Sequence, residues 1–161
     1  RKDPHSGGTE AEIAQQNAFL YTLKADLERG VEAVHRIEAL RIQLQTLGRF
    51  TSDAEAKAAA TALEEELVEL EMELVDLRLT GQGQDGIRFE AKLLQKLGYL
   101  AGSLSGADFR PTDQQVEVRG ILHRQLGEAL DALKALEGAE LADFNAMLRT
   151  KGLALIGYRP N

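Results

Sequence analysis

The sequence predicts an all-α fold, an antiparallel up-and-down bundle with three long helices and one shorter helix. The 161 residues are 43% hydrophobic and 28% charged, with only 3 prolines, a composition that suits long helices better than turn-rich sheets. Leucines recur every three or four residues over long stretches, as expected for one buried helix face. The connections between these stretches are short, which places successive helices antiparallel. A three-helix bundle with the short helix packed on one end is the alternative.

The formal net charge of −7 argues against nucleic acid and anionic membranes as partners, because their phosphate groups would be repelled. The sequence contains no run of 18 or more apolar residues, so no membrane insertion is predicted. The chain has no cysteine, which excludes disulfides and thiolate metal sites, and we predict no cofactor. It begins with Arg1 rather than Met, as expected for a piece of a longer or processed protein.

The first predicted helix follows a polar lead-in of residues 1–8 and runs from Thr9 to about Leu47. Thr9 and Glu12 have the spacing of a capping box, in which each side chain accepts a hydrogen bond from the other residue's backbone amide. Gly30 weakens the middle of this helix, and Arg41 interrupts its apolar series. The positions predicted to be buried are Ile13, Leu20, Leu23, Leu27, Val34, Ile37 and Leu44.

The second predicted helix begins after Gly48, a helix stop, with Ser52 and Asp53 as caps, and ends near Leu79. Its predicted buried stripe consists of Leu63, Leu67, Leu70, Leu74 and Leu77. Acidic side chains occupy the opposite face, which we expect to be solvated: Glu64, Glu65, Glu69, Glu73 and Asp76.

Two further helices are predicted, a short one over residues 89–104 and a long one over residues 113–150. On the short helix, Gly98 and Gly102 favour a close crossing with a neighbouring helix, and the buried side is Phe89, Leu93, Leu97, Leu100 and Leu104. The long helix begins with a second capping box and is expected to bend at Gly127 or Gly138. Its predicted buried positions include Leu126, Leu130, Leu133, Leu141, Phe144 and Leu148. The bundle therefore comprises residues 9–152, and residues 153–161 form a tail.

The glycines Gly81, Gly83 and Gly86 have the G-x-G-x-x-G spacing of dinucleotide-binding loops. That motif works only between a strand and a helix of a β-α-β unit. Here a leucine-rich helix precedes the motif, and the sequence has no alternation of strands and helices. We therefore interpret these glycines as a turn between two helices.

Two helical histidines are candidates for chemistry. Glu32 and His35 have the E-x-x-H spacing of di-iron bundles. However, the neighbouring Val34 belongs to the buried stripe, so both side chains should face outward and no metal site is predicted. The stretch HRQLG from His123 is similar to the H-x-x-K-G of phosphotransfer bundles but lacks the lysine. No serine lies in a nucleophile elbow, and no catalytic residue is predicted.

The two loops that flank the short helix contain arginine and aromatic residues, which often anchor protein interfaces. We consider them a candidate docking surface that consists of Asp85, Arg88, Phe89, Asp108, Phe109 and Arg110. The alternative is purely structural. In that case Arg88 pairs with Asp85 or Asp108, and the two phenylalanines close the end of the bundle.

Several segments carry a family resemblance: LRLTGQGQD from Leu77, Arg88-Phe89 with Ala91-Lys92-Leu93, KLGYLAG from Lys96, ADFRPTDQQVEV from Ala107 and FNAML from Phe144. Together they resemble the C-terminal helical region of large bacterial proteins with sortilin-like, BNR-repeat β-propellers, often labelled glycosyl hydrolases. Lys2-Asp3-Pro4 is similar to the end of the β-rich domain that precedes this region. One departure is Phe89-Glu90, where a Trp-Pro-like pair is expected.

The resemblance implies a non-catalytic accessory domain, because any activity would belong to the propeller. It also implies export to the periplasm or beyond, although the sequence alone is equally compatible with the cytoplasm. The implied partners are the protein's own β-rich or propeller domains, another protein, or a second copy of the chain. The alternative hypothesis is a free-standing ligand-sensing or histidine phosphotransfer bundle, with His35 or His123 as the functional residue.

Overall fold

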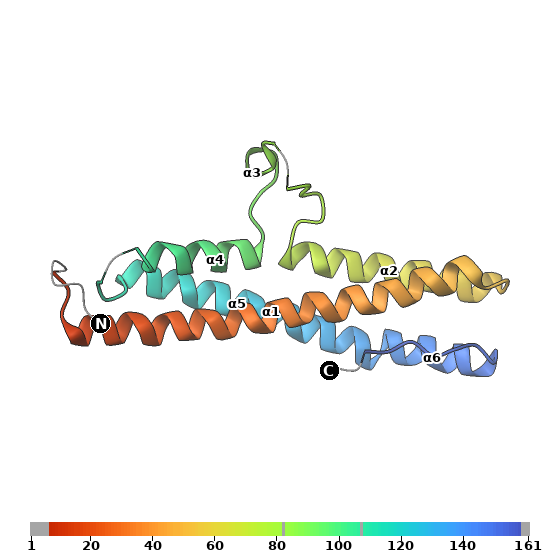
Figure 1. Cartoon of the computed structure of the whole chain (residues 1–161). Helices are drawn as coiled ribbons and strands as arrows, with labels where there is room; N and C mark the ends of the chain where they lie inside the picture. Colours follow the sequence, from red (N-terminus) through yellow and green to blue (C-terminus); the bar gives the residue numbers. More distant parts are fainter. Residues whose placement is uncertain (1–6, 82, 107, 159–161) are drawn as a thin grey trace.

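The structure is a computed structural model that describes residues 7–81, 83–106 and 108–158, and it confirms the all-α helical bundle (Figure 1). The predicted lead-in and tail lie partly outside these residues. The helices of the described residues are α1 (Glu10–Phe50), α2 (Ala54–Leu74), α3 (Asp85–Arg88), α4 (Leu93–Leu104), α5 (Asp113–Gly138) and α6 (Glu140–Thr150).

The helices form three antiparallel legs of an elongated bundle. The first leg is α1 alone, whose 41 residues span about 60 Å at a rise of about 1.5 Å per residue. The second leg runs back along α1 and consists of α2 followed by α4, and the third consists of α5 followed by α6 (Figure 1). The short helix α4 thus lies beyond the end of α2, beside the N-terminal half of α1.

One hydrophobic core runs along the bundle, and leucine supplies most of it. The largest fully buried apolar side chains are Leu23, Ile37, Leu40, Leu44, Leu67, Leu74, Leu97, Leu126 and Leu148. On α1, one of the two predicted apolar series is fully buried at Leu23, Ile37 and Leu44. The other series is only half-buried, at Ile13, Leu20, Leu27 and Val34. The structure therefore confirms the predicted phase of this helix.

The second helix ends earlier than predicted. The helix α2 stops at Leu74 because Val75 is extended, and Leu77 is exposed rather than buried. Residues 75–92 then leave the bundle as a projecting loop that carries α3, which we call the α3 loop (Figure 1). Asp76, predicted to be solvated, is buried at the base of this loop. The short helix begins at Leu93 instead of Phe89, because Phe89 still belongs to the α3 loop.

The close helix crossing occurs at a different glycine from those predicted. A Cβ atom on Gly98 or Gly102 would meet nothing within 4 Å, so neither glycine makes room for a neighbour. A Cβ on Gly30 would lie 2.2 Å from Cδ2 of Leu94, because α1 and α4 approach each other there. The predicted bend at Gly138 is confirmed, since α5 ends at this residue and α6 begins at Glu140.

The C-terminal segment, residues 153–158, packs back on the bundle between two side-chain amides. The amide of Asn145 donates to the carbonyl of Ile156 at 2.7 Å and accepts from its N–H at 2.8 Å. The amide of Gln43 donates to the carbonyl of Gly157 at 2.9 Å and accepts from its N–H at 3.1 Å. Ile156 is buried as a result and belongs to the core.

Across residues 7–81, 83–106 and 108–158, no helix combines the length and the apolar character needed to cross a membrane.

Candidate functional site

The most apolar open groove beside the short helix lies between α4 and α5, and we call it the α4–α5 groove. Its volume is about 500 Å³. The apolar residues that line it are Ala91, Tyr99, Leu100, Val118 and Leu122, and the polar ones are Gln95, Lys96, Ser103, Gln114 and Gln115. Tyr99 is 81% exposed although it lies in an apolar groove. A groove of this size falls within the range of sites that bind ligands or partner side chains.

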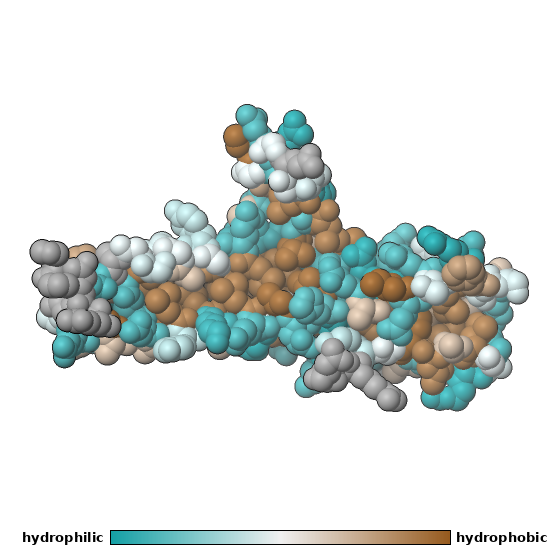
Figure 2. All heavy atoms as spheres, viewed as in Figure 1, coloured by the Kyte–Doolittle hydropathy of each residue, from teal (hydrophilic) through white to brown (hydrophobic). Residues whose placement is uncertain are grey.

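The helix α4 is amphipathic, with a leucine face toward the core and one exposed aromatic residue among polar residues on the opposite side. Its core-facing side consists of Leu93, Leu97, Leu100 and Leu104. Leu94 and Ala101 are only half-buried, and Tyr99 points outward. Figure 2 shows hydrophobic residues gathered over α4 and the adjoining middle of α1. Tyr99 is therefore the large apolar side chain of α4 that this bundle leaves exposed.

The rim of the groove is polar and partly ordered. The amide of Gln115 donates to the hydroxyl of Ser103 at 3.3 Å, which joins α5 to α4. Nζ of Lys96 lies 3.1 Å from the carboxylate of Glu90. The hydrogen bond from Lys96 holds the pKa of Glu90 below its ordinary value, and the charges of Lys96 and Lys92 add to the effect. The one lysine that lines the groove is therefore already paired with a carboxylate.

The chain enters the bundle beside one end of the groove. Gly8 packs so closely on the turn between α4 and α5 that a Cβ there would lie 1.6 Å from the carbonyl oxygen of Asp108. Nearly two turns into the chain's first helix, the amide of Gln16 donates to the carbonyl of Leu104 at the end of α4. Gly8 is consequently held against the turn that joins the two helices of the groove.

The α3 loop is ordered by two aspartates. Asp76 accepts a bidentate pair of hydrogen bonds from the guanidinium of Arg78, at 2.8 and 2.6 Å. The guanidinium carbon lies 4.4 Å from the centre of the Phe89 ring, which places Arg78 between a carboxylate and an aromatic face. Asp85 accepts hydrogen bonds from Thr80 and from the backbone N–H of Gly81. The glycine motif therefore lies in a connector between helices, as predicted, and Gly81 and Gly83 have positive φ.

The structure separates the six residues of the predicted docking surface into two groups. One group lies on the α3 loop, before α4, and the other lies after α4: Asp85, Arg88 and Phe89, then Asp108, Phe109 and Arg110. The 12 residues of α4 stand between them. The two groups do not form one continuous surface, although each lies at one end of the helix that borders the groove.

The structural alternative for these residues is wrong in its details. Among the residues that the structure describes, Arg88 pairs with neither Asp85 nor Asp108, and Asp85 binds Thr80 and Gly81 instead. Phe89 stacks on Arg78, and Phe109 is exposed rather than closing the bundle end. The side-chain pairings expected from the sequence are therefore wrong, and the docking role of these two loops stays a prediction.

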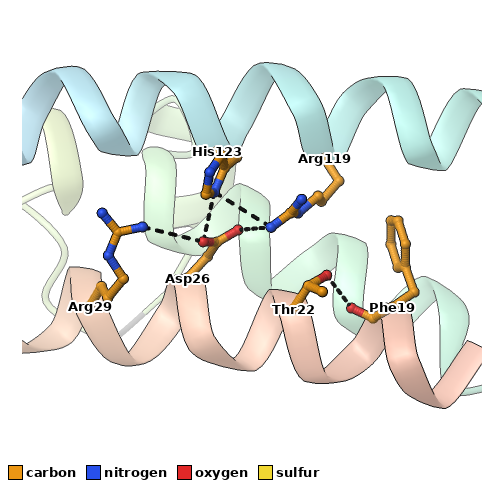
Figure 3. A network of polar contacts seen from close by, with 6 residues as sticks. All are labelled: Phe19, Thr22, Asp26, Arg29, Arg119 and His123. Atoms are coloured by element: carbon orange, nitrogen blue, oxygen red, sulfur yellow. Dashed lines mark hydrogen bonds and ion pairs between the residues drawn. The ribbon is translucent and has the colours of Figure 1, made fainter.

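Sequence reasoning missed a buried carboxylate on α1. Asp26 has a side chain only 3% exposed, and it faces α5 (Figure 3). Nδ1 of His123 lies 2.8 Å from one carboxylate oxygen, and Nη2 of Arg119 lies 3.0 Å from the other. Arg29 approaches at 3.7 Å from its own helix. The signal in the sequence was an acidic residue three positions after the buried Leu23, on the same side of α1.

The other helical histidine is placed as predicted. Glu32 and His35 are both exposed, and Glu32 accepts a hydrogen bond of 2.7 Å from the hydroxyl of Tyr158 in the C-terminal segment. That hydrogen bond is the main reason why the pKa of Tyr158 is raised. In the described part of the chain, His, Asp and Glu side chains form no group of three or more that could hold a metal ion.

Comparison of the chain with family models, curated proteins and solved structures found no match in any of the three. The resemblance to the C-terminal region of sortilin-like propeller proteins therefore stays a prediction, and the geometry of the chain itself is the basis for a functional proposal.

Proposed function

We propose that this chain is a non-catalytic helical accessory module of a larger, exported β-propeller protein, and that its α4–α5 groove docks the β-rich domain that precedes it. The proposal joins two independent arguments. The family resemblance supplies the kind of protein and the kind of neighbour. The exposed position of Tyr99 in an apolar groove supplies the surface, and it is the observation on which the docking role depends.

The chemistry of the groove favours a protein segment as its occupant. Large aromatic side chains in apolar surroundings are frequent anchors of interfaces, and Tyr99 has both properties. The floor is apolar and the rim is amide and lysine, which is the usual division between the core and the edge of an interface.

The path of the chain favours the preceding domain as the source of that segment. Gly8 is packed against Asp108, at the turn between the two helices that form the groove. A domain joined to the chain before residue 7 would therefore be attached at this end of the bundle. Attachment nearby raises the effective concentration of the domain at the groove, so even a small interface would be occupied.

Three buried carboxylates are bound by arginine side chains, which argues against general acid-base catalysis by any of them. Asp26 binds Arg119, Glu71 binds Arg41, and Asp76 binds Arg78. Two of these pairs join different helices, and the third fixes the base of the α3 loop. Carboxylates with such partners hold elements together, whereas acid-base catalysis needs a carboxyl group that a substrate can reach.

The test is site-specific photo-crosslinking in the full-length protein encoded by the reading frame that contains this chain. A photoreactive phenylalanine replaces Tyr99, and the matched control replaces Tyr21, which is 71% exposed on α1 and does not line the groove. We expect position 99, and not position 21, to crosslink to a β-rich domain upstream of residue 1, as mapped by mass spectrometry.

Three results would overturn this proposal. One is a reading frame without a preceding β-rich domain. Another is crosslinking from position 99 only to a second copy of the chain, which would make the groove an oligomer interface. The third is equal crosslinking from positions 99 and 21, which would show that the groove has no preference for a partner.

A further inference from the structure

His123 is oriented by a buried carboxylate on the opposite helix. A carboxylate oxygen of Asp26 lies 2.8 Å from Nδ1, a distance that requires Nδ1 to donate, because an ionised carboxylate only accepts hydrogen bonds. With its proton on Nδ1, the neutral imidazole carries its lone pair on Nε2. Among the described residues Nε2 has no hydrogen-bond partner, and the side chain is 46% exposed.

The surroundings of His123 on α5 leave the ring open to an approaching molecule. Gly120 lies one turn before the histidine and Gly127 one turn after it, and a Cβ on either would meet nothing within 4 Å. Residues three and four positions apart are neighbours on a helix surface. Two of the positions that flank the imidazole along the helix therefore carry no side chain, and Arg119, four residues before the histidine, is the flanking side chain that remains.

Cationic groups surround the ring in a protein whose net charge is −7. Nη2 of Arg119 lies 3.5 Å from Nδ1 of His123 and also binds Asp26, and Arg29 reaches the same carboxylate from α1 (Figure 3). Arg124 follows directly in the sequence and is exposed. Guanidinium groups bind the oxygens of phosphoryl groups well, because their N–H donors match that geometry.

We propose that His123 is a phosphoryl acceptor, with Nε2 as the nucleophile, an acyl phosphate as the donor and Asp26 as the residue that positions the ring. The proposal is independent of the docking role, because His123 contacts α1 whereas the α5 residues that line the groove are Gln114, Gln115, Val118 and Leu122. An accessory module can therefore carry both features.

The proposed step balances without a further reactant. The lone pair of Nε2 forms the N–P bond while the P–O bond of the acyl phosphate breaks, and the electron pair of that bond leaves with the carboxylate product. The ring keeps its proton on Nδ1 and gains positive charge, which the carboxylate of Asp26 stabilises at 2.8 Å. Fixed groups that face a developing charge are an efficient form of catalytic stabilisation.

The test is incubation of the whole chain with acetyl phosphate, followed by detection of acid-labile phosphohistidine by ³¹P NMR and by peptide mapping at neutral pH. We expect the label on His123 and its loss in His123→Gln. His35 provides the internal control, because it is also exposed on a helix but has no hydrogen-bonded carboxylate among the described residues. His35→Gln should therefore label as the unchanged chain does.

The positioning role of Asp26 needs a readout that loss of stability would not reproduce. Asp26→Asn keeps the shape of the side chain but removes its charge, and we expect labelling of His123 to slow about tenfold or more. In the unchanged chain, ¹⁵N NMR of His123 should show the proton of the neutral ring on Nδ1. The proposal is overturned if the neutral ring carries its proton on Nε2, if no label forms, or if His35 and His123 label equally.

Discussion

Arg41 of α1 binds the fully buried carboxylate of Glu71 in α2, with 2.6 Å between Nη1 and Oε2. Arg41 is the residue that interrupts the apolar series of α1, and Glu71 follows Leu70 in the buried stripe of α2. A charge on each helix thus replaces an apolar contact at this point of the core. Nε of Arg41 and Oε1 of Glu71 are both buried without a hydrogen-bond partner in the described part of the chain.

This pair should stabilise the bundle less than an apolar pair of similar size would. We expect Arg41→Leu alone to lower the free energy of unfolding by about 3–5 kcal/mol, since it leaves the buried carboxylate of Glu71 without its partner. Glu71→Leu alone should cost less, because Arg41 is 20% exposed and also lies 3.7 Å from Glu64. The double variant Arg41→Leu/Glu71→Leu should be about as stable as the unchanged chain, or more stable. Urea denaturation measures all three variants.

The control for these three variants is the exposed pair Lys24–Glu28 on α1, in which Nζ of Lys24 lies 3.3 Å from Oε1 of Glu28. Removal of either partner there should change stability by about 0.5 kcal/mol or less. A double variant at Arg41 and Glu71 that is as unstable as the sum of the single variants would contradict the prediction.

Gly30 should resist substitution although it lies in the middle of a helix. Alanine has the higher helix propensity by about 1 kcal/mol, but its Cβ at position 30 would collide with the side chain of Leu94. Gly98→Ala gains the same propensity without a collision. We expect Gly30→Ala to be less stable than Gly98→Ala by about 1–3 kcal/mol in thermal or urea unfolding.

A second substitution identifies the cause. Leu94→Ala removes the atoms that the new methyl group meets, so the penalty of Gly30→Ala should shrink when the two changes are combined. An equal effect of alanine at positions 30 and 98 would show that α1 and α4 do not approach closely.

Asp76 should titrate at unusually low pH. The hydrogen bonds and charge of Arg78 lower the pKa of Asp76 from 3.8 to about 2, against the opposite effect of burial. The pKa in the folded state lies below that in the unfolded state, so this carboxylate stabilises the fold fully above about pH 4 and loses the effect as the pH falls through about 2. NMR of the carboxyl carbon measures the midpoint directly.

The matched variant for this titration is Arg78→Ala. It removes the main cause of the shift, so the pKa of Asp76 should rise toward its ordinary value, because only the backbone N–H of residue 78 and the charge of Lys92 then oppose the effect of burial. Arg88→Ala, on the same loop, should leave the midpoint unchanged. A midpoint near 4 in the unchanged chain would mean that Arg78 and Asp76 are not paired in solution.

The C-terminal segment should be released when one side-chain amide is removed. Asn145→Ala deletes two hydrogen bonds to Ile156, and we expect the amide of Ile156 to exchange with deuterium about tenfold faster. Gln125→Ala, a change to an exposed amide on α5, is the control and should leave this exchange unaltered. Unchanged protection in Asn145→Ala would show that packing of Ile156 alone holds the segment.

The sequence predicted features that depend on neighbours within one helix. The capping boxes of Thr9 with Glu12 and of Thr112 with Gln115 are both present, because each involves residues only three positions apart. The buried face of α1 and the outward position of His35 follow from helical periodicity for the same reason.

Features that join distant parts of the chain could not be predicted in this way. Asp26 and His123 are 97 positions apart, and no local pattern marks the pair. Leucines continue at helical spacing past Leu74, but the turn of Asp76 toward Arg78 ends the helix there. The close approach at Gly30 depends on Leu94, which lies on a different helix, so the sequence around Gly30 does not indicate it.

The molecule consists of two short bundles that follow one another along its length, and the continuous helix α1 runs through both. One half contains α4 and the first part of α5, and the other contains α2, α6 and the remainder of α5, so the halves share only α1 and α5. The single leucine core continues through both halves, and the joint between them lies where the α3 loop leaves the bundle. Segments connected in this way often open as separate cooperative units, so one half can fray while α1 holds the other folded.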